Sequence, residues 1–240
     1  QCVCFRRAFS LEQDTYLLHH TLGGRVSKRH PTLTGLAIMP LTASLELCAE
    51  AASLLVSQKS VCGFENVRAL RWIDFAQGER ILEAKATRGQ DADRVTVVLY
   101  LMEQSGTQKI SAVECTVVFG HYAPSPLPRA LFKVAEPIQP RLVGEKIYSE
   151  ILFHGPLFQV LTDVEQFGAD GLVVGVEMNE RQKWLGRASP EGFFTDPVLL
   201  DSSGQGVGVW ALNTLQDNPI PFPIGIKTLR MLGPPAQVPD

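Results

Sequence analysis

Two kinds of side chain in this sequence could do acid–base chemistry: a pair of histidines near the N-terminus and one aspartate far along the chain. His19 and His20 end a short apolar run, and Gly23 and Gly24 follow two residues later. A neutral imidazole can remove a proton near pH 7. Successive residues of an extended segment face opposite sides, so only one of the two histidines can point at a given pocket. The spacing fits a catalytic base and equally a structural histidine at a strand end.

Asp201 and Gln205 are four residues apart in a stretch with helical character, so their side chains share one helix face. The surrounding residues are small or apolar: Leu199, Leu200, Gly204 and Val207. A carboxyl group in such surroundings is partly desolvated, which raises its pKa and keeps the neutral acid available near neutral pH. A polar residue that only bonds within its own helix would show the same spacing, so the pattern supports both interpretations.

Other sites for catalysis or metal binding find little support. The five cysteines include no CxxC pair and no histidine at zinc-finger spacing, which favours free thiols in a reducing cytoplasm over a metal site or a disulfide. Gly204, Gly206 and Gly208 lie inside a helical pattern, so a dinucleotide-binding loop is not expected there. The serines form no GxSxG elbow.

Two helices must position the candidate residues, and each is entered through a proline. Pro40 opens the first helix, predicted over residues 40 to 57, because proline is favoured in a first turn. Its buried stripe recurs at three- and four-residue steps: Leu41, Leu45, Cys48, Ala52 and Leu55. Asp196 and Pro197 supply an N-cap and a first-turn proline for a second helix, predicted over residues 196 to 213.

Extended segments surround each helix; apolar and polar residues alternate in 82–87, one face of 113–119 is apolar, and 95–102 is more uniformly apolar. In the first half they are expected at residues 2–9, 14–18, 82–87, 95–102 and 113–119, and in the second half near 158–167, 171–178 and 224–232. Prolines interrupt residues 121 to 142, which favours a linker. The pattern predicts an α+β fold of two similar halves, residues 1–120 and 143–240, each a helix wrapped by an antiparallel sheet.

Composition excludes several classes of protein. A hydrophobic fraction of 45 % and a charged fraction of 20 % are ordinary for a globular chain and argue against disorder. The net charge of -3 does not indicate binding to nucleic acid or to an anionic membrane, which an excess of basic residues would favour. No apolar run is long enough to span a bilayer. Gln1 is not an initiator and no signal pattern follows it, so we expect a soluble, cytoplasmic module of a longer protein.

The candidate residues also resemble, in order, the motifs of the dehydratase domains of polyketide synthases, which have the double hot dog fold. The family's His-xxx-Gly-xxxx-Pro motif is similar to His20, Gly24 and Pro40, with an insertion of about eleven residues between the glycine and the proline. Its Asp-xxx-Gln motif matches Asp201 and Gln205.

Two further motifs extend this resemblance over nearly the whole chain. The family's Tyr-Gly-Pro element appears as His154-Gly155-Pro156, so that a histidine replaces the tyrosine and its hydroxyl. Pro221-Phe222-Pro223 looks like the family's Leu-Pro-Phe segment. The chain ends soon after the predicted strand at residues 224–232, earlier than a complete second hot dog would.

The resemblance implies a 3-hydroxyacyl thioester dehydratase. His20 is then the base, because the family's base usually follows an aspartate, and His19 occupies that position here. His20 would remove the α-proton, and Asp201, kept protonated by its apolar surroundings, would protonate the β-hydroxyl. The residues expected to bind substrate or support these two are Gly24, Pro40, Gln205, His154, Gly155 and Pro156.

The same resemblance implies the partners. The substrate would arrive on the phosphopantetheine of an acyl carrier protein, with neighbouring synthase domains and a second copy of this domain as further partners. No metal or redox cofactor is expected. Backbone N–H groups near Gly24 or at the start of the Pro40 helix could stabilise the enolate-like oxygen.

Other functions of the same fold stay open. A related enzyme could move a double bond or cyclise a chain in the manner of a product-template domain. A hot dog thioesterase would release a free acid. A non-catalytic module could bind an acyl chain or only dimerise, with His20 and Asp201 as structural residues.

Overall fold

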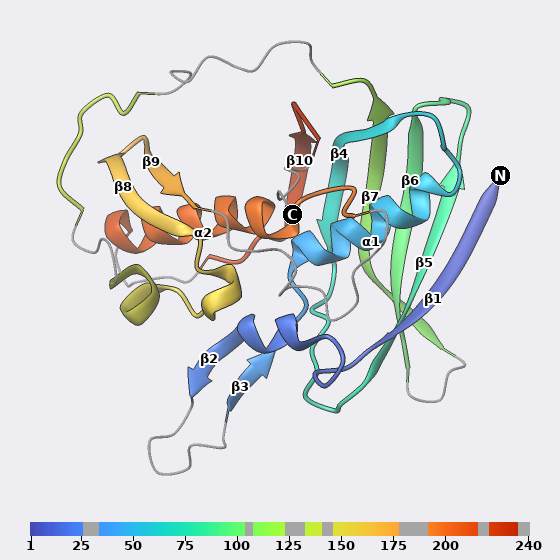
Figure 1. The fold of residues 1–240 in the computed structure, drawn as a ribbon, viewed down its shortest axis with the longest axis horizontal. Coiled ribbons are helices and arrows are strands. Elements are labelled where there is room, and N and C mark those ends of the chain that lie inside the picture. The colour runs from blue at the N-terminus through green and yellow to red at the C-terminus, as the bar shows by residue number, and fades with distance from the viewer. Residues whose placement is uncertain are drawn as a thin grey trace.

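A large antiparallel sheet dominates the computed structural model, which describes residues 1–25, 34–103, 108–122, 133–140, 146–177, 192–215 and 221–234. Its strands are β1 (Cys2–Phe9), β4 (Ser60–Ala69), β5 (Arg80–Arg88), β6 (Arg94–Met102), β7 (Lys109–Gly120) and β10 (Gly225–Arg230). They lie in the order β1-β5-β6-β7-β4-β10, with β1 at one edge (Figure 1). The segments expected to be extended at residues 2–9, 82–87, 95–102 and 113–119 are therefore strands of one sheet.

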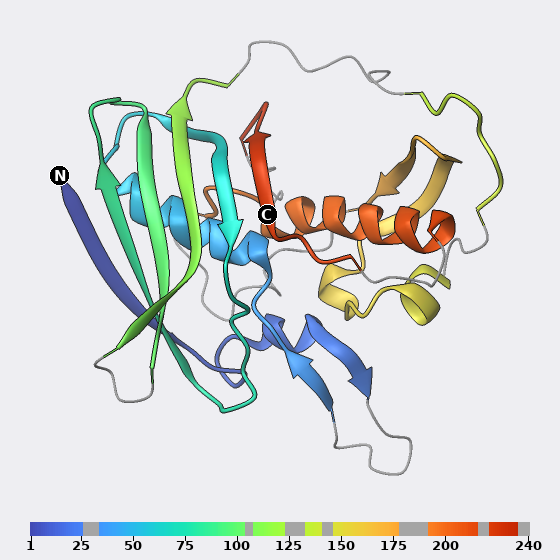
Figure 2. The ribbon, with the colours of Figure 1, turned by 180° about the vertical axis from the view of Figure 1, so that it is seen from behind.

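Helix α1 (Leu41–Ser53) lies across one face of this sheet (Figures 1 and 2). Its small and apolar residues are buried against the inward residues of the strands, so a single hydrophobic core fills the space between helix and sheet. The prediction of a helix here is confirmed, with two differences at its ends. Pro40 is the N-cap and stands just before the first turn, and the helix ends at Ser53, before residue 57.

Strand β10 comes from the C-terminal part of the chain, yet it pairs with β4 of the large sheet. Gly63 in β4 permits the close approach, because its φ is 157° and a Cβ there would lie 2.0 Å from the carbonyl oxygen of Leu229. The segment expected to be strand-like at residues 224–232 is thus a strand, and it extends the sheet formed by the first half.

The segment before the histidines differs from the prediction. Residues 14–18 were expected to be extended, but Thr15–His19 form a 3-10 helix, η1. Asp14 accounts for this turn, because it accepts hydrogen bonds from the Ser10 backbone N–H and from Arg7 and holds the chain in a tight loop. Strands β2 (Thr21–Arg25) and β3 (Thr34–Ala37) follow as a hairpin. Residues 26–33 of the predicted insertion lie outside the described residues.

The second half packs its own helix on a smaller sheet. Helix α2 (Pro197–Thr214) lies against the two-stranded sheet of β8 (Leu161–Gly168) and β9 (Gly171–Val176) (Figure 2). Two short turns precede β8: the π-helical turn η2 (Ile147–Ile151) and the 3-10 helix η3 (Pro156–Phe158). Asp196 caps α2 as predicted, since its side chain accepts a hydrogen bond from the Leu199 N–H at 3.1 Å. Most of the predicted linker, residues 123–132 and 141–142, lies outside the described residues.

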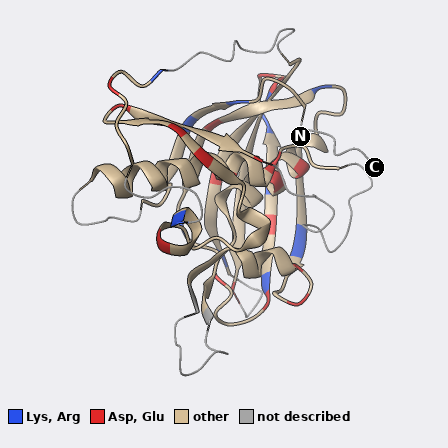
Figure 3. Cartoon of the chain, turned by 60° about the vertical axis from the view of Figure 1, so that its left-hand side comes forward, with Lys and Arg blue, Asp and Glu red and all other residues tan. Residues whose placement is uncertain are grey.

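The remaining surface and core features agree with the composition. Acidic and basic residues are interspersed over the strands of the large sheet (Figure 3). All five cysteines are free. None of the described helices combines the length and the apolar character that crossing a membrane would require.

Candidate active site

A mainly apolar cavity of about 170 Å³ brings His20 and Asp201 together. Its walls come from the segment after η1, the N-terminal part of α1, the loop between η2 and η3, and α2. His154 and Gln205 line it as well. The two residues predicted to do chemistry are 181 positions apart in the sequence (201 − 20), and the packing of the two halves makes them neighbours.

His20 is held by its backbone and by one ring nitrogen. Its N–H donates to the Leu17 carbonyl and its carbonyl accepts from the Ile38 N–H, both at 3.1 Å. The ring nitrogen Nδ1 lies 2.9 Å from the Ile38 carbonyl oxygen, which can only accept. Nδ1 therefore carries the proton, and Nε2 is left with a free lone pair. This is the tautomer that a general base requires.

Burial keeps His20 neutral. Only 7 % of the residue is exposed, and this desolvation lowers its pKa to about 4, although the Asp201 carboxylate opposes the shift. Phe153 and Phe158 pack on its ring, with centroids 5.0 and 5.5 Å away. His20 can therefore accept a proton across the whole neutral pH range.

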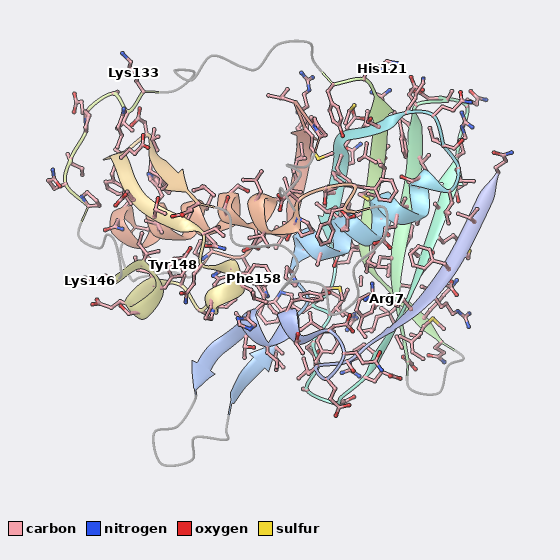
Figure 4. All side chains as sticks on the ribbon, in the orientation of Figure 1. Arg7, His121, Lys133, Lys146, Tyr148 and Phe158 are labelled. Atoms are coloured by element: carbon pink, nitrogen blue, oxygen red, sulfur yellow. The ribbon has the colours of Figure 1, made fainter. Side chains whose placement is uncertain are left out.

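Asp201 is fixed through a chain of hydrogen bonds that begins in η2. The Leu161 N–H donates to the Tyr148 hydroxyl, and this hydroxyl donates to Gln205 Oε1, both at 2.8 Å. The Gln205 amide then donates to Asp201 Oδ2 at 2.8 Å and to the Phe158 carbonyl at 2.9 Å. Tyr148 and Phe158 lie between the short helical turns and α2 (Figure 4). Gln205 thus orients Asp201, as its spacing on the helix indicated.

The expectation that apolar surroundings keep Asp201 protonated is wrong. Burial does favour the neutral acid, but the hydrogen bond and charge of His154, the charge of His20 and the Gln205 amide together outweigh it. The net effect lowers the pKa of Asp201. The direction of this shift favours the carboxylate form of Asp201 over the neutral acid.

His154 is brought to the site by backbone pairing. It forms an isolated antiparallel bridge with His20, and the Gly155 N–H donates to the His19 carbonyl at 2.7 Å. The His154 ring lies 5.2 Å from the His20 ring, and its Nε2 is 3.2 Å from Asp201 Oδ2. The two sequence motifs that contain His20 and His154 are thus joined in one short pairing.

His19 has a different role from His20. Its carbonyl oxygen accepts a hydrogen bond from the Gly155 N–H, and its Nδ1 accepts one from the Leu157 N–H at 3.3 Å. His19 therefore fastens the loop that carries His154, while its neighbour lines the cavity. Only one of the two adjacent histidines lines the cavity, as expected, but the reason differs from the prediction, because His19 ends the 3-10 helix η1 and is not part of an extended segment.

A metal ion could use one set of described residues. His20, His154 and Asp201 each offer a ligand atom, and these atoms lie within 4.8 Å of one another. Two histidines and one carboxylate form a donor set that divalent transition metals accept.

Not every expected supporting residue reaches the cavity. Among the described residues, those that line it do not include Gly24, Pro40, Gly155 or Pro156. Gly24 belongs to β2, and the glycine with the positive φ of 84° is Gly23, so the backbone there turns one residue earlier than expected. Pro40, Gly155 and Pro156 shape the backbone beside the cavity.

Sequence patterns missed two residues that shape the site, Tyr148 and Trp72. Tyr148 anchors Gln205, and nothing in its local sequence distinguishes it from other aromatic residues. The rings of Trp72 and Phe222 pack against each other where the cavity borders on solvent, and their centroids are 5.1 Å apart. Trp72 is 50 % exposed and Phe222 is 36 % exposed. The position of Phe222 in a family-like motif was a signal, whereas Trp72 had none.

Comparisons with known proteins agree with this architecture. A scan against protein-family models finds no match, and neither does a search of the curated proteins. Among solved structures, the dehydratase domain from the CurF module of curacin polyketide synthase aligns with a TM-score of 0.69 and 15 % identity, over 95 % of this chain and 77 % of that one. A trans-AT polyketide synthase dehydratase domain from Brevibacillus brevis aligns with a TM-score of 0.72 and 12 % identity, over 97 % and 78 %.

Two further similar structures are variants of the CurK dehydratase, one with a histidine changed to phenylalanine and one with an aspartate changed to asparagine. Each is described as an inactive mutant, and each aligns with a TM-score of 0.69 and 16 % identity over 98 % of this chain and 78 % of that one. The chain therefore has the α+β double hot dog fold of polyketide synthase dehydratase domains.

Proposed function

We propose that this chain dehydrates a 3-hydroxyacyl thioester, carried on an acyl carrier protein, to the 2-enoyl thioester. The observation that carries the proposal is the meeting of His20 and Asp201 in one apolar cavity, with His20 neutral and its Nε2 free to accept a proton. The loss of water requires a base at the carbon next to the thioester and a group that handles the hydroxyl one carbon further. These are the two groups that the cavity contains.

The neighbouring structures support this assignment by analogy. The CurK dehydratase variants that lack a histidine or an aspartate are described as inactive. In this chain His20 and Asp201 are the corresponding pair of residue types that share a cavity. His20 would remove the α-proton, and Asp201 would contact the β-hydroxyl.

The start of α1 could stabilise the oxygen that becomes negative as the α-proton leaves. Leu41 and Thr42 line the cavity, and the first-turn N–H groups of a helix have no acceptor within it. These groups carry the positive end of the helix dipole. A thioester carbonyl directed at this end would receive hydrogen bonds that strengthen as the enolate forms.

The apolar lining and the aromatic border suit an acyl chain. Trp72 and Phe222 stand where the cavity is open to solvent, so a tethered substrate can enter past them while its reacting carbons lie near His20. We expect an acyl carrier protein to deliver it on phosphopantetheine, within a cytoplasmic multidomain synthase and in a homodimer. No cofactor takes part in the proposed reaction.

Single substitutions at the two proposed catalytic residues test the function. His20→Ala and Asp201→Asn are each expected to lower the rate of water loss by about 10²–10⁴-fold, the usual contribution of a general acid or base. His121→Ala is the matched control, because His121 is exposed and lies at the far end of the large sheet (Figure 4). Mass spectrometry of a 3-hydroxyacyl carrier protein would follow the loss of water, and circular dichroism would check the fold.

The same assay separates the alternatives. Binding of the acyl carrier protein without turnover by the wild-type chain would select a non-catalytic module. Release of a free acid would select a thioesterase. With a 2-enoyl carrier protein as the substrate instead, a product of unchanged mass with a moved double bond would select an isomerase, and cyclisation of a polyketo chain would select a product-template-like enzyme. Near-normal turnover by either variant would refute the role assigned to that residue.

A further inference from the structure

Three side chains that can bind a metal ion meet in the cavity. His20, His154 and Asp201 each offer one ligand atom, and these atoms lie within 4.8 Å of one another. The three residues come from separate segments of the chain: the position after η1, the loop before η3, and α2. Two imidazole nitrogens and one carboxylate oxygen are a donor set that zinc and non-haem iron sites use.

Two of these atoms are already as far apart as neighbouring ligands of one ion. His154 Nε2 lies 3.2 Å from Asp201 Oδ2. Zinc bonds to nitrogen and oxygen are about 2.0–2.1 Å long, so two ligands at a tetrahedral angle are about 3.3 Å apart. His20 would have to approach by at most about 1.5 Å, because no two of the ligand atoms are more than 4.8 Å apart. The rings of His20 and His154 are inclined by 67°, so they are not stacked and their nitrogens can face one point.

Two of the three ligands have the outer hydrogen bonds that hold metal ligands in place. A ligating histidine usually donates its second ring N–H to a carbonyl or carboxylate oxygen, which leaves the other nitrogen for the ion. His20 Nδ1 lies 2.9 Å from the Ile38 carbonyl oxygen, so the free lone pair is on Nε2. Asp201 Oδ2 accepts a hydrogen bond from the Gln205 amide, and Tyr148 holds Gln205 in turn. Both ligands are therefore oriented by the protein itself.

His154 lacks such an outer partner. Its Nδ1 is buried and has no hydrogen-bond partner among the described residues. With Nε2 on an ion, Nδ1 would carry the ring proton and leave it unpaired, and a missing outer partner lowers metal affinity by about 10–100-fold. The stacked ring of Phe153, 4.2 Å away, and the backbone bridge to His20 still fix the position of His154. These contacts suit an ion that binds reversibly.

We propose that His20, His154 and Asp201 form a binding site for a divalent ion of the zinc type, and that this ion inhibits the enzyme. The His20 lone pair that would accept the α-proton is the one that binds the ion, so metal and substrate exclude each other. Binding of the ion goes beyond the proposed function, whereas its competition with the substrate rests on that function. The nitrogen donors favour Zn²⁺ over Mg²⁺, which selects oxygen ligands.

An ion can reach the three ligands through the open side of the cavity. Trp72 and Phe222 border on solvent there. Among the described residues that line the cavity, Asp201 and Arg71 are the ones with a permanently charged type of side chain. Arg71 is exposed, so water screens its repulsion of a cation near Asp201.

Binding of the metal alone tests the site. Cys2 and Cys4 are exposed thiols that could bind the same ions elsewhere on the surface, so both are changed to serine in every protein used, and no affinity tag is present. Isothermal titration calorimetry should show one Zn²⁺ bound per chain. Co²⁺ should give the visible absorption of an ion with nitrogen and oxygen ligands, and a large excess of Mg²⁺ should not displace either ion.

Three variants assign the ligands. His20→Phe, His154→Phe and Asp201→Asn should each weaken Zn²⁺ binding by more than about 100-fold, which exceeds the loss of an outer partner. His121→Phe is the control, because His121 is exposed, and its affinity should equal that of the parent protein. Circular dichroism shows which variants are folded, and the ligands lie on three segments, so any one folded variant decides. No Zn²⁺ binding to the parent protein, or undiminished binding in a folded variant, would overturn the proposal.

The dehydration assay measures the competition. Zn²⁺ should raise the KM for the 3-hydroxyacyl carrier protein without changing kcat, and a chelator should restore the original rate. His154→Phe, compared with its own metal-free rate, should be unaffected at Zn²⁺ concentrations that halve the rate of the parent protein. Zn²⁺ bound at these three residues without any change in rate would refute the competition. A parent protein that releases no water would refute the proposed function instead, while the calorimetry still decides the metal site.

Discussion

Glu46 in α1 holds Thr195 through two hydrogen bonds, from its backbone N–H at 2.8 Å and from its hydroxyl at 2.5 Å. A third comes from the Phe194 N–H at 2.7 Å. Thr195 directly precedes Asp196, the N-cap of α2. One buried side chain of the first helix therefore sets where the second helix begins, and with it the position of Asp201.

The burial of Glu46 predicts a fall in stability as the pH rises, because desolvation outweighs the hydrogen bonds from Thr195 and Phe194, which lower its pKa. Burial raises the pKa of Glu46 to about 7, above its ordinary value of 4.5, so the folded protein binds a proton that the unfolded chain releases. The stabilisation is complete below pH 4.5 and is lost as the pH rises to about 7. The difference of about 2.5 pH units corresponds to about 3 kcal/mol. Urea unfolding at pH 5 and pH 8 would measure it.

Glu46→Gln provides the control for this pH effect. The amide cannot ionise, so the free energy of unfolding of this variant should be nearly constant between pH 5 and pH 8. The NH₂ group of the glutamine amide is a donor and would face N–H groups that need an acceptor. The variant should therefore be less stable than the wild type at pH 5 by about 1–3 kcal/mol. An equally steep pH dependence in wild type and variant would show that another group is responsible.

Much of the fold follows from local patterns, because strands and helices depend on periodicity. The alternation in residues 82–87 and 113–119 and the stripe on residues 41–55 lead to β5, β7 and α1. What the patterns could not provide is the pairing of β10 with β4, which depends on close approach at Gly63. The turn of η1 was also missed, since it depends on bonds of the Asp14 side chain to residues before it.

The sequence predicted some of the residues that line the cavity, but not the effect of the surroundings on the pKa of Asp201. Spacing and family resemblance pointed to His20, Asp201 and Gln205, and all three line one cavity. The protonation of Asp201 was predicted wrongly, because local sequence shows only apolar neighbours in α2. The group that reverses the effect, His154, comes from a distant loop. Glu46 offered a signal that was overlooked: an acid in a buried helical stripe needs a partner.

Tyr148→Phe should loosen Asp201 without touching the reacting groups. The change leaves Gln205 Oε1 and the Leu161 N–H without their shared hydroxyl. Each unsatisfied buried group costs about 1–3 kcal/mol. We expect lower stability and a drop in kcat that exceeds the change in KM, since the amide that orients Asp201 is no longer anchored. An unchanged kcat in the folded variant would contradict this role; thermal unfolding and steady-state kinetics measure both effects.

Gly155→Ala should separate the two halves of the site. A Cβ at this position would lie 2.9 Å from His19 Nδ1 and 3.0 Å from His19 Cα, and the backbone atom cannot give way as a flexible side-chain tip could. The His154 loop must then move away from the segment that carries His20. Activity should fall at least tenfold, with destabilisation of about 1–3 kcal/mol from the crowding.

Gly206→Ala is the opposite case among the glycines. It lies within α2, and a Cβ there meets nothing within 4 Å. Alanine should stabilise the helix by up to about 1 kcal/mol and leave the rate unchanged, because glycine loses more freedom on folding. A destabilised Gly206→Ala would mean that the backbone of α2 tolerates no side chain on this face. The melting temperatures of the two glycine variants should therefore move in opposite directions.

The acid limit of activity should lie well below that of an ordinary histidine base. Desolvation lowers the pKa of His20 to about 4, so this histidine stays neutral and able to accept a proton from pH 8 down to pH 5. A base with an unperturbed pKa near 6.5 would lose most of its activity over this range. Initial rates of water loss between pH 4 and pH 9 measure the limit. Half-maximal kcat/KM near pH 6.5 would show that His20 is hydrated and charged more readily than its burial implies.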